Sequence, residues 1–136
     1  MIYLEKPKEF EPRFEIISCF CECDGEILLL HRQDHKPEGG TWGVPAGKLN
    51  SKESLFSGIL REIQEETGFF ALEKDLLYFR KVFVKYPDYD FLYHIFSVSL
   101  PSKPKVVINP DEHKDFVWKD PRDALKINLI RVLMNV

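Results

Sequence analysis

The sequence predicts an α+β domain in which a mixed β-sheet lies between helices. Two observations carry this prediction. Segments with the composition of strands come before and after one amphipathic helical segment at 51–67, and a second helical segment follows the last strand. The chain has 136 residues, 44% hydrophobic and 30% charged, which suits one globular unit. We therefore expect a single domain over 1–136.

The first two strands are predicted to form a hairpin. Residues 13–23 are rich in Phe, Ile and Cys, Asp24-Gly25 is a strong tight-turn signal, and residues 26–31 follow as the return strand. The three cysteines alternate along the first strand, at Cys19, Cys21 and Cys23. We expect them on one face as small buried side chains, because neighbours spaced roughly 6.6 Å apart on a strand cannot all reach one metal ion.

A glycine-rich connection leads from the hairpin into the helix. Residues 33–41 form a loop, and residues 41–49 form a brief strand that runs into a structured loop. Asn50 followed by Glu53 fits a helix N-cap with a capping box. The helix is therefore expected from about 51 to 67, with Gly68 ending it in a left-handed conformation.

The second half of the chain is predicted to return to strands and close with a helix. Strands are expected at 76–85 and 91–99, with shorter ones at 104–108 and 116–118. A final helix opens at Asp120-Pro121, with proline at its first position. Its apolar side chains share one face: Leu125, Leu129, Val132 and Leu133.

The helix at 51–67 carries two distinct faces. At about 100° per residue, its apolar side chains gather on one side: Phe56, Ile59, Leu60, Ile63 and Thr67. Three carboxylates gather away from that stripe: Glu62, Glu65 and Glu66. Like charges at this spacing repel by a few tenths of a kcal/mol per pair. A bound divalent cation would remove the repulsion, whereas an ordinary solvated acidic face is the alternative.

The spacing around these glutamates decides between the two interpretations. Gly47 is followed after five residues by Glu53, and after seven more by REIQEETGF at 61–69. At roughly 7% usage per residue type, a chance match of its seven fixed positions has a probability on the order of 10⁻⁸ per window. Residues 47–69 resemble the Nudix box in full. Residues 42–48 resemble the family's lead-in, with Ala46 where glycine is commoner.

The resemblance to Nudix hydrolases implies an α/β/α sandwich and metal-dependent hydrolysis of a diphosphate linkage in a small nucleotide-type substrate. The positions that it assigns to ligands of Mg²⁺ or Mn²⁺ are the Gly47 carbonyl, Glu62, Glu65 and Glu66. It also implies that Glu62 helps to activate water and that Glu53 and Arg61 support the site. Glu112, followed by Asp111, is our candidate for a second base or ligand, with a plain acidic turn as the alternative.

Substrate contacts are less constrained by the sequence. Arg32 and Lys48 could contact phosphate, and Tyr86, with Tyr89 and Tyr93, could stack on a base. Ordinary surface charge or packing is the alternative for each. Nudix enzymes for ADP-ribose and for dinucleoside polyphosphates are often sorted by a Pro or Tyr beyond the box. Tyr86 and Pro87 both stand there, so the class of nucleoside-diphosphate derivative stays open.

Charge and hydropathy argue against other kinds of partner. The net charge of −3 leaves no basic field for a nucleic-acid polymer. No apolar run approaches the ~18 residues of a membrane span, and the N-terminal residues lack a signal-peptide core, so we expect a cytoplasmic protein. A homodimer is compatible with these features. An isoprenoid diphosphate isomerase and a non-catalytic nucleotide-binding module on the same fold stay open, although the complete set of box glutamates favours hydrolysis.

Overall fold

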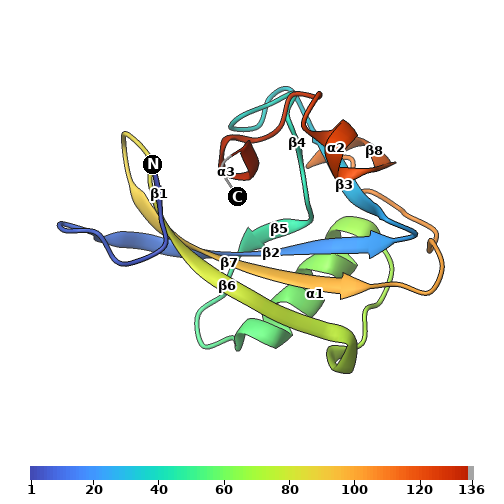
Figure 1. The fold of residues 1–136 in the computed structure, drawn as a ribbon, viewed down its shortest axis with the longest axis horizontal. Coiled ribbons are helices and arrows are strands. Elements are labelled where there is room, and N and C mark those ends of the chain that lie inside the picture. The colour runs from blue at the N-terminus through green and yellow to red at the C-terminus, as the bar shows by residue number, and fades with distance from the viewer. Residues whose placement is uncertain (135–136) are drawn as a thin grey trace.

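A mixed sheet lies between helices in the computed structural model (Figure 1). The structure describes the backbone of residues 1–134 and the side chains of residues 1–132. Its strands are β1 (Ile2–Tyr3), β2 (Pro12–Cys23), β3 (Glu26–Arg32), β4 (Trp42–Gly43), β5 (Ala46–Lys48), β6 (Leu76–Lys85), β7 (Asp90–Ser99) and β8 (His113–Lys119). Its helices are α1 (Leu55–Thr67), the 3-10 turn η1 (Glu73–Asp75), α2 (Pro121–Ala124) and α3 (Arg131–Met134).

The sheet runs in the order β1-β6-β7-β2-β3-β4, with β5 beside β2 and β8 beside β3. β2 and β7 are parallel, and the other pairs are antiparallel. This arrangement confirms the predicted α+β class with a mixed sheet. Among the helices of residues 1–134, none has the length and apolar character that a membrane crossing requires.

The predicted hairpin between β2 and β3 is confirmed. Asp24 and Gly25 have positive φ angles of 53° and 78°, as a two-residue turn between antiparallel strands requires. The carboxylate of Glu22 accepts a hydrogen bond from the Gly25 amide at 3.0 Å. The turn therefore fixes the register at the end of β2, where Cys23 pairs with Glu26.

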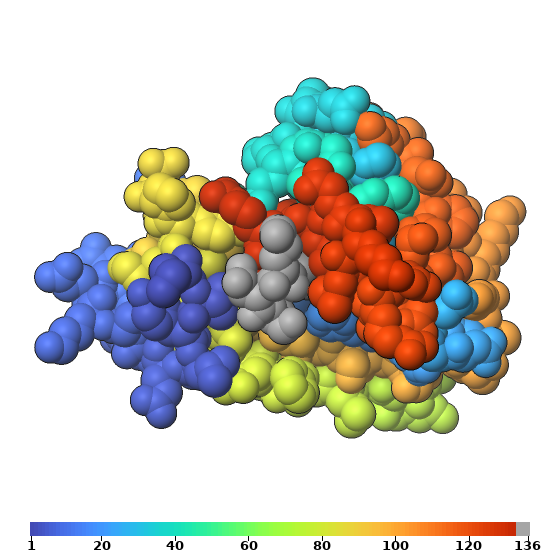
Figure 2. Space-filling model, turned by 45° about the horizontal axis from the view of Figure 1, so that its top comes forward, coloured from blue at the N-terminus to red at the C-terminus, as the bar shows by residue number. Residues whose placement is uncertain are grey.

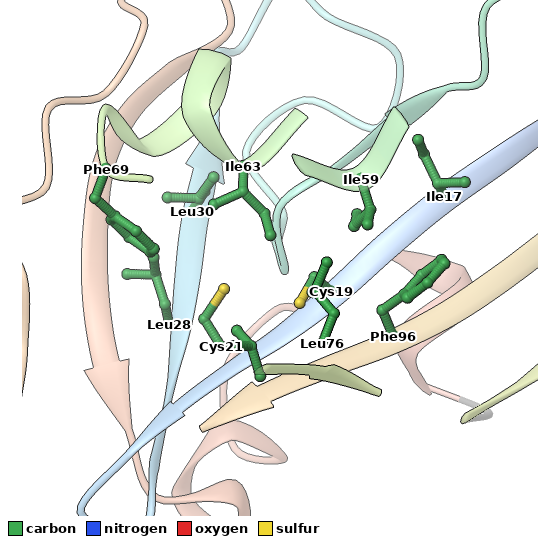
Figure 3. Close-up of a cluster of buried hydrophobic side chains, with 11 residues drawn as sticks. Ile17, Cys19, Cys21, Leu28, Leu30, Ile59, Ile63, Phe69, Leu76 and Phe96 are labelled. Atoms are coloured by element: carbon green, nitrogen blue, oxygen red, sulfur yellow. The ribbon is translucent and has the colours of Figure 1, made fainter. Parts of the chain in front are cut away.

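One face of the sheet packs against α1, with the helix phase that the sequence predicts. Ile59 and Ile63 are fully buried against Ile17, Cys19 and Phe96 of the sheet (Figure 3). Burying one such aliphatic side chain stabilises a fold by about 1.5–3 kcal/mol. All three cysteines are buried as free thiols, as expected for small core residues.

The opposite face is covered by the C-terminal segment. Val132 of α3 packs with a cluster on β6 and β7 that includes Tyr93, while Leu129 packs with Leu29 of β3. Two backbone hydrogen bonds attach the segment to β4. The Trp42 amide donates to the Asn128 carbonyl at 2.8 Å, and the Ile130 amide donates to the Trp42 carbonyl at 2.9 Å. Because α2 and α3 are short, this second helical layer is thin.

The helix α1 begins later than the capping-box pattern predicts. Its N-cap is Ser54, not Asn50, and the Ser54 hydroxyl accepts an amide hydrogen bond from the first turn at 3.1 Å. Glu53 does accept from the Asn50 amide at 3.0 Å, but this bond closes a turn ahead of the helix. The physical reason is tertiary, because the Glu53 carboxylate is held by Arg61 at 2.7 Å.

Two further expectations in the second half were wrong. Residues 104–108 form no strand, since Pro104 cannot donate to a ladder and the Val107 amide instead donates to the last carbonyl of α1, on Thr67, at 2.8 Å. The predicted C-terminal helix is broken after α2, because the pairing with Trp42 pulls the chain into an extended path. Leu125 consequently lies 73% exposed. The side chain of Leu133 lies outside the described residues.

We expect Ile63→Asp to unfold the protein. The substitution would place a carboxylate without a partner between α1 and the sheet, which costs several kcal/mol against a typical total stability of about 5–15 kcal/mol. Thermal unfolding followed by circular dichroism measures the effect. Phe70→Asp is the matched control, because Phe70 is 80% exposed and its replacement should leave the melting temperature nearly unchanged. A wild-type melting temperature for Ile63→Asp would contradict the helix phase.

Candidate active site

A cavity of about 490 Å³ is lined by α1, β5, the face of the sheet away from α1 and the C-terminal segment. We call one part of its lining the carboxylate end: Arg32, Ala46, Gly47, Lys48, Glu62, Glu65, Glu66, Asn109, Glu112 and His113. The other part, the aromatic end, contains Phe14, Ile16, Glu38, Tyr86, Tyr89, Phe91, Tyr93, Ile130 and Val132. The volume is in the range of small-molecule sites, roughly 300–1,000 Å³.

Gly47 brings the backbone of β5 directly against the carboxylate of Glu62. A Cβ atom built on Gly47 would lie 2.3 Å from both Cδ and Oε1 of Glu62, so no larger residue fits without moving that carboxylate. β5 is held in place by its antiparallel pairing with β2, in which Gly47 lies opposite Ile17. The glycine of the box is therefore required here by close approach.

Arg61 ties the site together. Its Nε and Nη2 donate to the two oxygens of Glu53 at 2.7 and 3.0 Å. Its Nη1 donates to Glu62 at 2.8 Å and to Glu65 at 3.2 Å. Nη2 also donates to the Lys48 carbonyl at 3.1 Å, which links α1 to β5. One guanidinium thus orients three glutamates, offsets part of their negative charge and anchors the segment that carries Gly47.

The pKa values of Glu53 and Glu62 are shifted in opposite directions. The hydrogen bond from Arg61 lowers the pKa of Glu53. Burial raises the pKa of Glu62, although the hydrogen bond and charge of Arg61 oppose this shift. The carboxylates also raise the pKa of Arg61 above its ordinary value, so the guanidinium stays charged.

Glu66 is the most deeply enclosed carboxylate of the box. Its residue is 9% exposed, and Oε1 accepts a hydrogen bond from the Ala46 amide at 2.8 Å. Burial raises the pKa of Glu66 well above its usual range, and the nearby charges of Glu62 and Glu112 add to this shift. The fold therefore places Glu66 at the carboxylate end, where its ionisation costs free energy.

The residues present fit a hard divalent cation. Glu62, Glu65, Glu66 and the Gly47 carbonyl are oxygen donors, and the close approach of Gly47 to Glu62 places backbone and carboxylate together. Among the described side chains, no three acidic, His or Cys groups already converge as a ligand set, and Arg61 donates hydrogen bonds to both Glu62 and Glu65. A cation would offset the cost of ionising Glu62 and Glu66.

Glu112 lines the carboxylate end, and Asp111 does not. The Glu112 carboxylate accepts a hydrogen bond from Lys36 Nζ at 2.9 Å, so the ammonium group of Lys36 orients this carboxylate. The amide of Asp111 donates to the Asn109 side chain at 3.0 Å, and its own side chain is exposed. The structure therefore favours Glu112 over Asp111 as the loop carboxylate of the site.

The two basic candidates also line the cavity. Arg32 Nε donates to the Pro37 carbonyl at 2.9 Å, which leaves its Nη groups for other contacts. Lys48 Nζ lies 4.5 Å from the centre of the Phe14 ring, where a cation–π contact holds it between the two ends of the cavity. Both positions suit contact with an anionic ligand.

Tyr86 is less free to stack than the sequence suggests. The Arg131 guanidinium lies 4.1 Å from the centre of the Tyr86 ring and covers one face. Glu38 accepts from the Arg131 Nε at 3.0 Å, which brings the loop at 33–41, cyan in Figure 2, against the red C-terminal segment. Burial, with the charge of Glu38, raises the pKa of Tyr86 to about 12. A base stacked here would have to use another ring or replace Arg131.

Several lining residues escaped the sequence reasoning. Phe14 and Phe91 stack at 5.5 Å in the aromatic end, and strand alternation could have placed both on this face. Glu38 follows a proline in a loop, and no local pattern marks it. His113 is 4% exposed, and its Nδ1 has no hydrogen-bond partner among the described residues. Burial, with Arg32 next in effect, lowers the pKa of His113 to about 4.

A mixed sheet between helices, with a glutamate-rich helix at the wall of a ligand-sized cavity, defines an α+β domain with a carboxylate-lined small-molecule site. The family model for the NUDIX domain matches residues 12–133. The chain belongs to the Nudix hydrolase family, as the resemblance implied.

Relatives support this membership across most of the chain. CTP pyrophosphohydrolase of Escherichia coli is 27% identical over 117 residues, which cover 85% of this chain and 82% of that protein. An uncharacterised Nudix hydrolase of Bacillus subtilis is 36% identical over 61 residues, covering 45% of this chain and 36% of that protein. The MutT protein of Methanosarcina mazei superposes with a TM-score of 0.73 at 25% identity, covering 88% of this chain and 86% of that one.

We expect Glu66→Gln to stabilise the metal-free protein at neutral pH. The raised pKa means that the folded protein binds this proton more tightly than the unfolded chain does. Ionised Glu66 therefore destabilises the fold, and the penalty fades as the pH falls below the folded-state pKa. In chelator at pH 8 the variant should melt about 3 °C or more above wild type, as ~1 kcal/mol produces at this size. The gap should shrink towards pH 5.

Glu73→Gln serves as the control for this comparison, because Glu73 is exposed in η1. It should melt like wild type at both pH values. A Glu66→Gln protein that is less stable than wild type at pH 8 would show that the Ala46 amide compensates the buried charge fully.

Proposed function

We propose that this protein hydrolyses a diphosphate linkage in a small nucleotide-type substrate, with Mg²⁺ or Mn²⁺ held by the box glutamates. One observation carries the proposal: Gly47 and the three box glutamates Glu62, Glu65 and Glu66 line a cavity whose other lining residues include several aromatic side chains. An anionic diphosphate bridge and a planar base need these two environments side by side. The family itself acts on phosphoanhydrides.

Glu62, Glu65, Glu66 and the Gly47 carbonyl would hold the ion, consistent with their shared position in the cavity lining. When bound, a divalent cation neutralises phosphate oxygens and lowers the pKa of its water. A manganese ion accompanies AMP in the structure of a Francisella tularensis NMN adenylyltransferase/ADP-ribose pyrophosphatase, which shares the fold at 23% identity and a TM-score of 0.71.

The chain's own residues would prepare the attack on phosphorus. Arg61 keeps Glu62 oriented, and either Glu62 or Glu112 accepts the proton of the attacking water. The water oxygen bonds to phosphorus while the bridging P–O bond breaks, so both products end in phosphate. Arg32 and Lys48 would contact the phosphate oxygens, since both line the cavity beside the carboxylates.

The size of the cavity is an argument for a substrate with one nucleotide unit. Its volume of about 490 Å³ suits a mononucleotide better than two linked nucleosides. Aromatic side chains line the cavity, with Tyr89 as the candidate to contact the base, and the E. coli relative acts, by its name, on CTP. We therefore favour nucleoside triphosphates over dinucleoside polyphosphates.

The two other functions on this fold have weaker support. The three cysteines are buried in the core, away from the cavity lining, so none is placed to act in an isomerase. A purely binding module would have no need of the Arg61 network, which orders three carboxylates at the cavity.

The direct test is phosphate-product release from a panel of nucleoside triphosphates, nucleotide sugars and dinucleoside polyphosphates, with Mg²⁺ or Mn²⁺ and with a chelator. We expect chelator-sensitive turnover, fastest on a nucleoside triphosphate. Tight metal binding without turnover of any member of the panel would contradict the proposal.

We expect Glu65→Gln to lower kcat/KM by about 10–100-fold while leaving the fold intact. The substitution removes a ligand charge without changing shape, and the Glu65 side chain is 52% exposed, so stability depends little on it. Steady-state kinetics and thermal melting measure the two effects separately. Normal turnover by a folded Glu65→Gln protein would refute the assignment of Glu65 as a metal ligand.

A further inference from the structure

His113 is a buried polar side chain that the proposed reaction does not use. Its residue is only 4% exposed, yet it lines the carboxylate end of the cavity. Its ring Nδ1 is enclosed and has no hydrogen-bond partner in the part of the chain that the structure describes. Leaving such an atom unpaired costs free energy, so a partner from outside the chain is expected.

The backbone around His113 is fixed, and only the ring lacks a partner. Its amide donates to the Asn109 carbonyl at 2.9 Å, and its carbonyl accepts from Gln33 Nε2 at 3.3 Å. In the sheet, His113 pairs with Arg32 across β8 and β3. The imidazole is therefore presented from a rigid strand, beside a guanidinium that also faces the cavity.

The surroundings of the ring favour an uncharged imidazole. The residue is buried and pairs across the sheet with the charged Arg32, and a second positive charge is costly in such a setting. A neutral imidazole can donate one N–H hydrogen bond without adding a positive charge. Such a donor would not repel a cation held nearby by Glu66, whereas another lysine or arginine would.

We propose that His113 is a substrate-binding residue that donates a hydrogen bond from Nδ1 to a non-bridging oxygen of the substrate's diphosphate group. The inference rests on the proposed function. The torsion about the Cβ–Cγ bond has two preferred orientations about a half-turn apart, and a ring in the second orientation would present Nδ1 where Cδ2 now lies, towards the ligand. His113 pairs with Arg32 and follows Glu112 in the chain, and the charges of both these residues act on Glu66, so the ring lies near the carboxylates that would face the phosphate groups.

Binding of imidodiphosphate, a diphosphate mimic with a nitrogen bridge, tests the proposal by calorimetry on the full chain with Mg²⁺. His113→Asn and His113→Leu have nearly the same shape, but only Asn retains a polar group at the Nδ1 position. We expect Leu to weaken the affinity about tenfold, which corresponds to about 1.4 kcal/mol. Asn should stay within about threefold of wild type.

His113→Gln places its amide at the Nε2 position instead, and it should weaken binding as Leu does. The Asn and Gln pair decides the matter if the Leu variant does not fold. His35→Leu is the control, because His35 is exposed and lies outside the cavity lining, and it should bind like wild type.

Equal affinity of the Leu, Asn and wild-type proteins would overturn the proposal, as would an Asn variant that binds as weakly as Gln. Either result, with wild-type turnover intact, leaves the proposed hydrolase standing and removes only the role of His113. A wild-type protein that neither binds imidodiphosphate nor turns over any nucleotide would instead remove the proposed function itself.

Discussion

The site depends on the position of one guanidinium. Arg61 bonds both oxygens of Glu53, reaches Glu62 and Glu65 from the same plane, and holds the carbonyl of Lys48. Without it, the carboxylates of α1 would repel one another and β5 would lose its link to the helix. The planar fork of arginine can make these contacts together, and a lysine ammonium could not.

The same helix serves the core and the cavity with adjacent faces. Ile59 and Ile63 fill the contact with the sheet, whereas Glu62 and Glu66 turn towards β5 on the neighbouring flank. Both carboxylates are buried enough for their pKa values to rise. Burying two ionisable groups lowers the stability of the fold, which fits a site in which a bound cation compensates their charge.

Local pattern predicted those elements whose structure depends on neighbours in sequence. The hairpin at Asp24-Gly25, the apolar face of α1 and its end at Gly68, whose φ is 79°, follow from turn chemistry and helical period. The start of α1 did not follow, since Arg61 recruits Glu53 into the site. The prediction of one continuous C-terminal helix was wrong for a similar reason, because hydrogen bonding to Trp42 outweighs the helical preference of the C-terminal segment.

The sequence by itself determined the family, the helix phase and the glutamates of the box, because these rest on residue types at short, regular spacing. Only the tertiary structure decided that Glu66 is enclosed while Glu65 is half exposed, that Arg131 covers Tyr86, and that His113 reaches the cavity unpaired. Each of these facts depends on segments far apart in the chain. Burial and contact at such separations follow from how the sheet and its layers pack, and no local spacing records that packing.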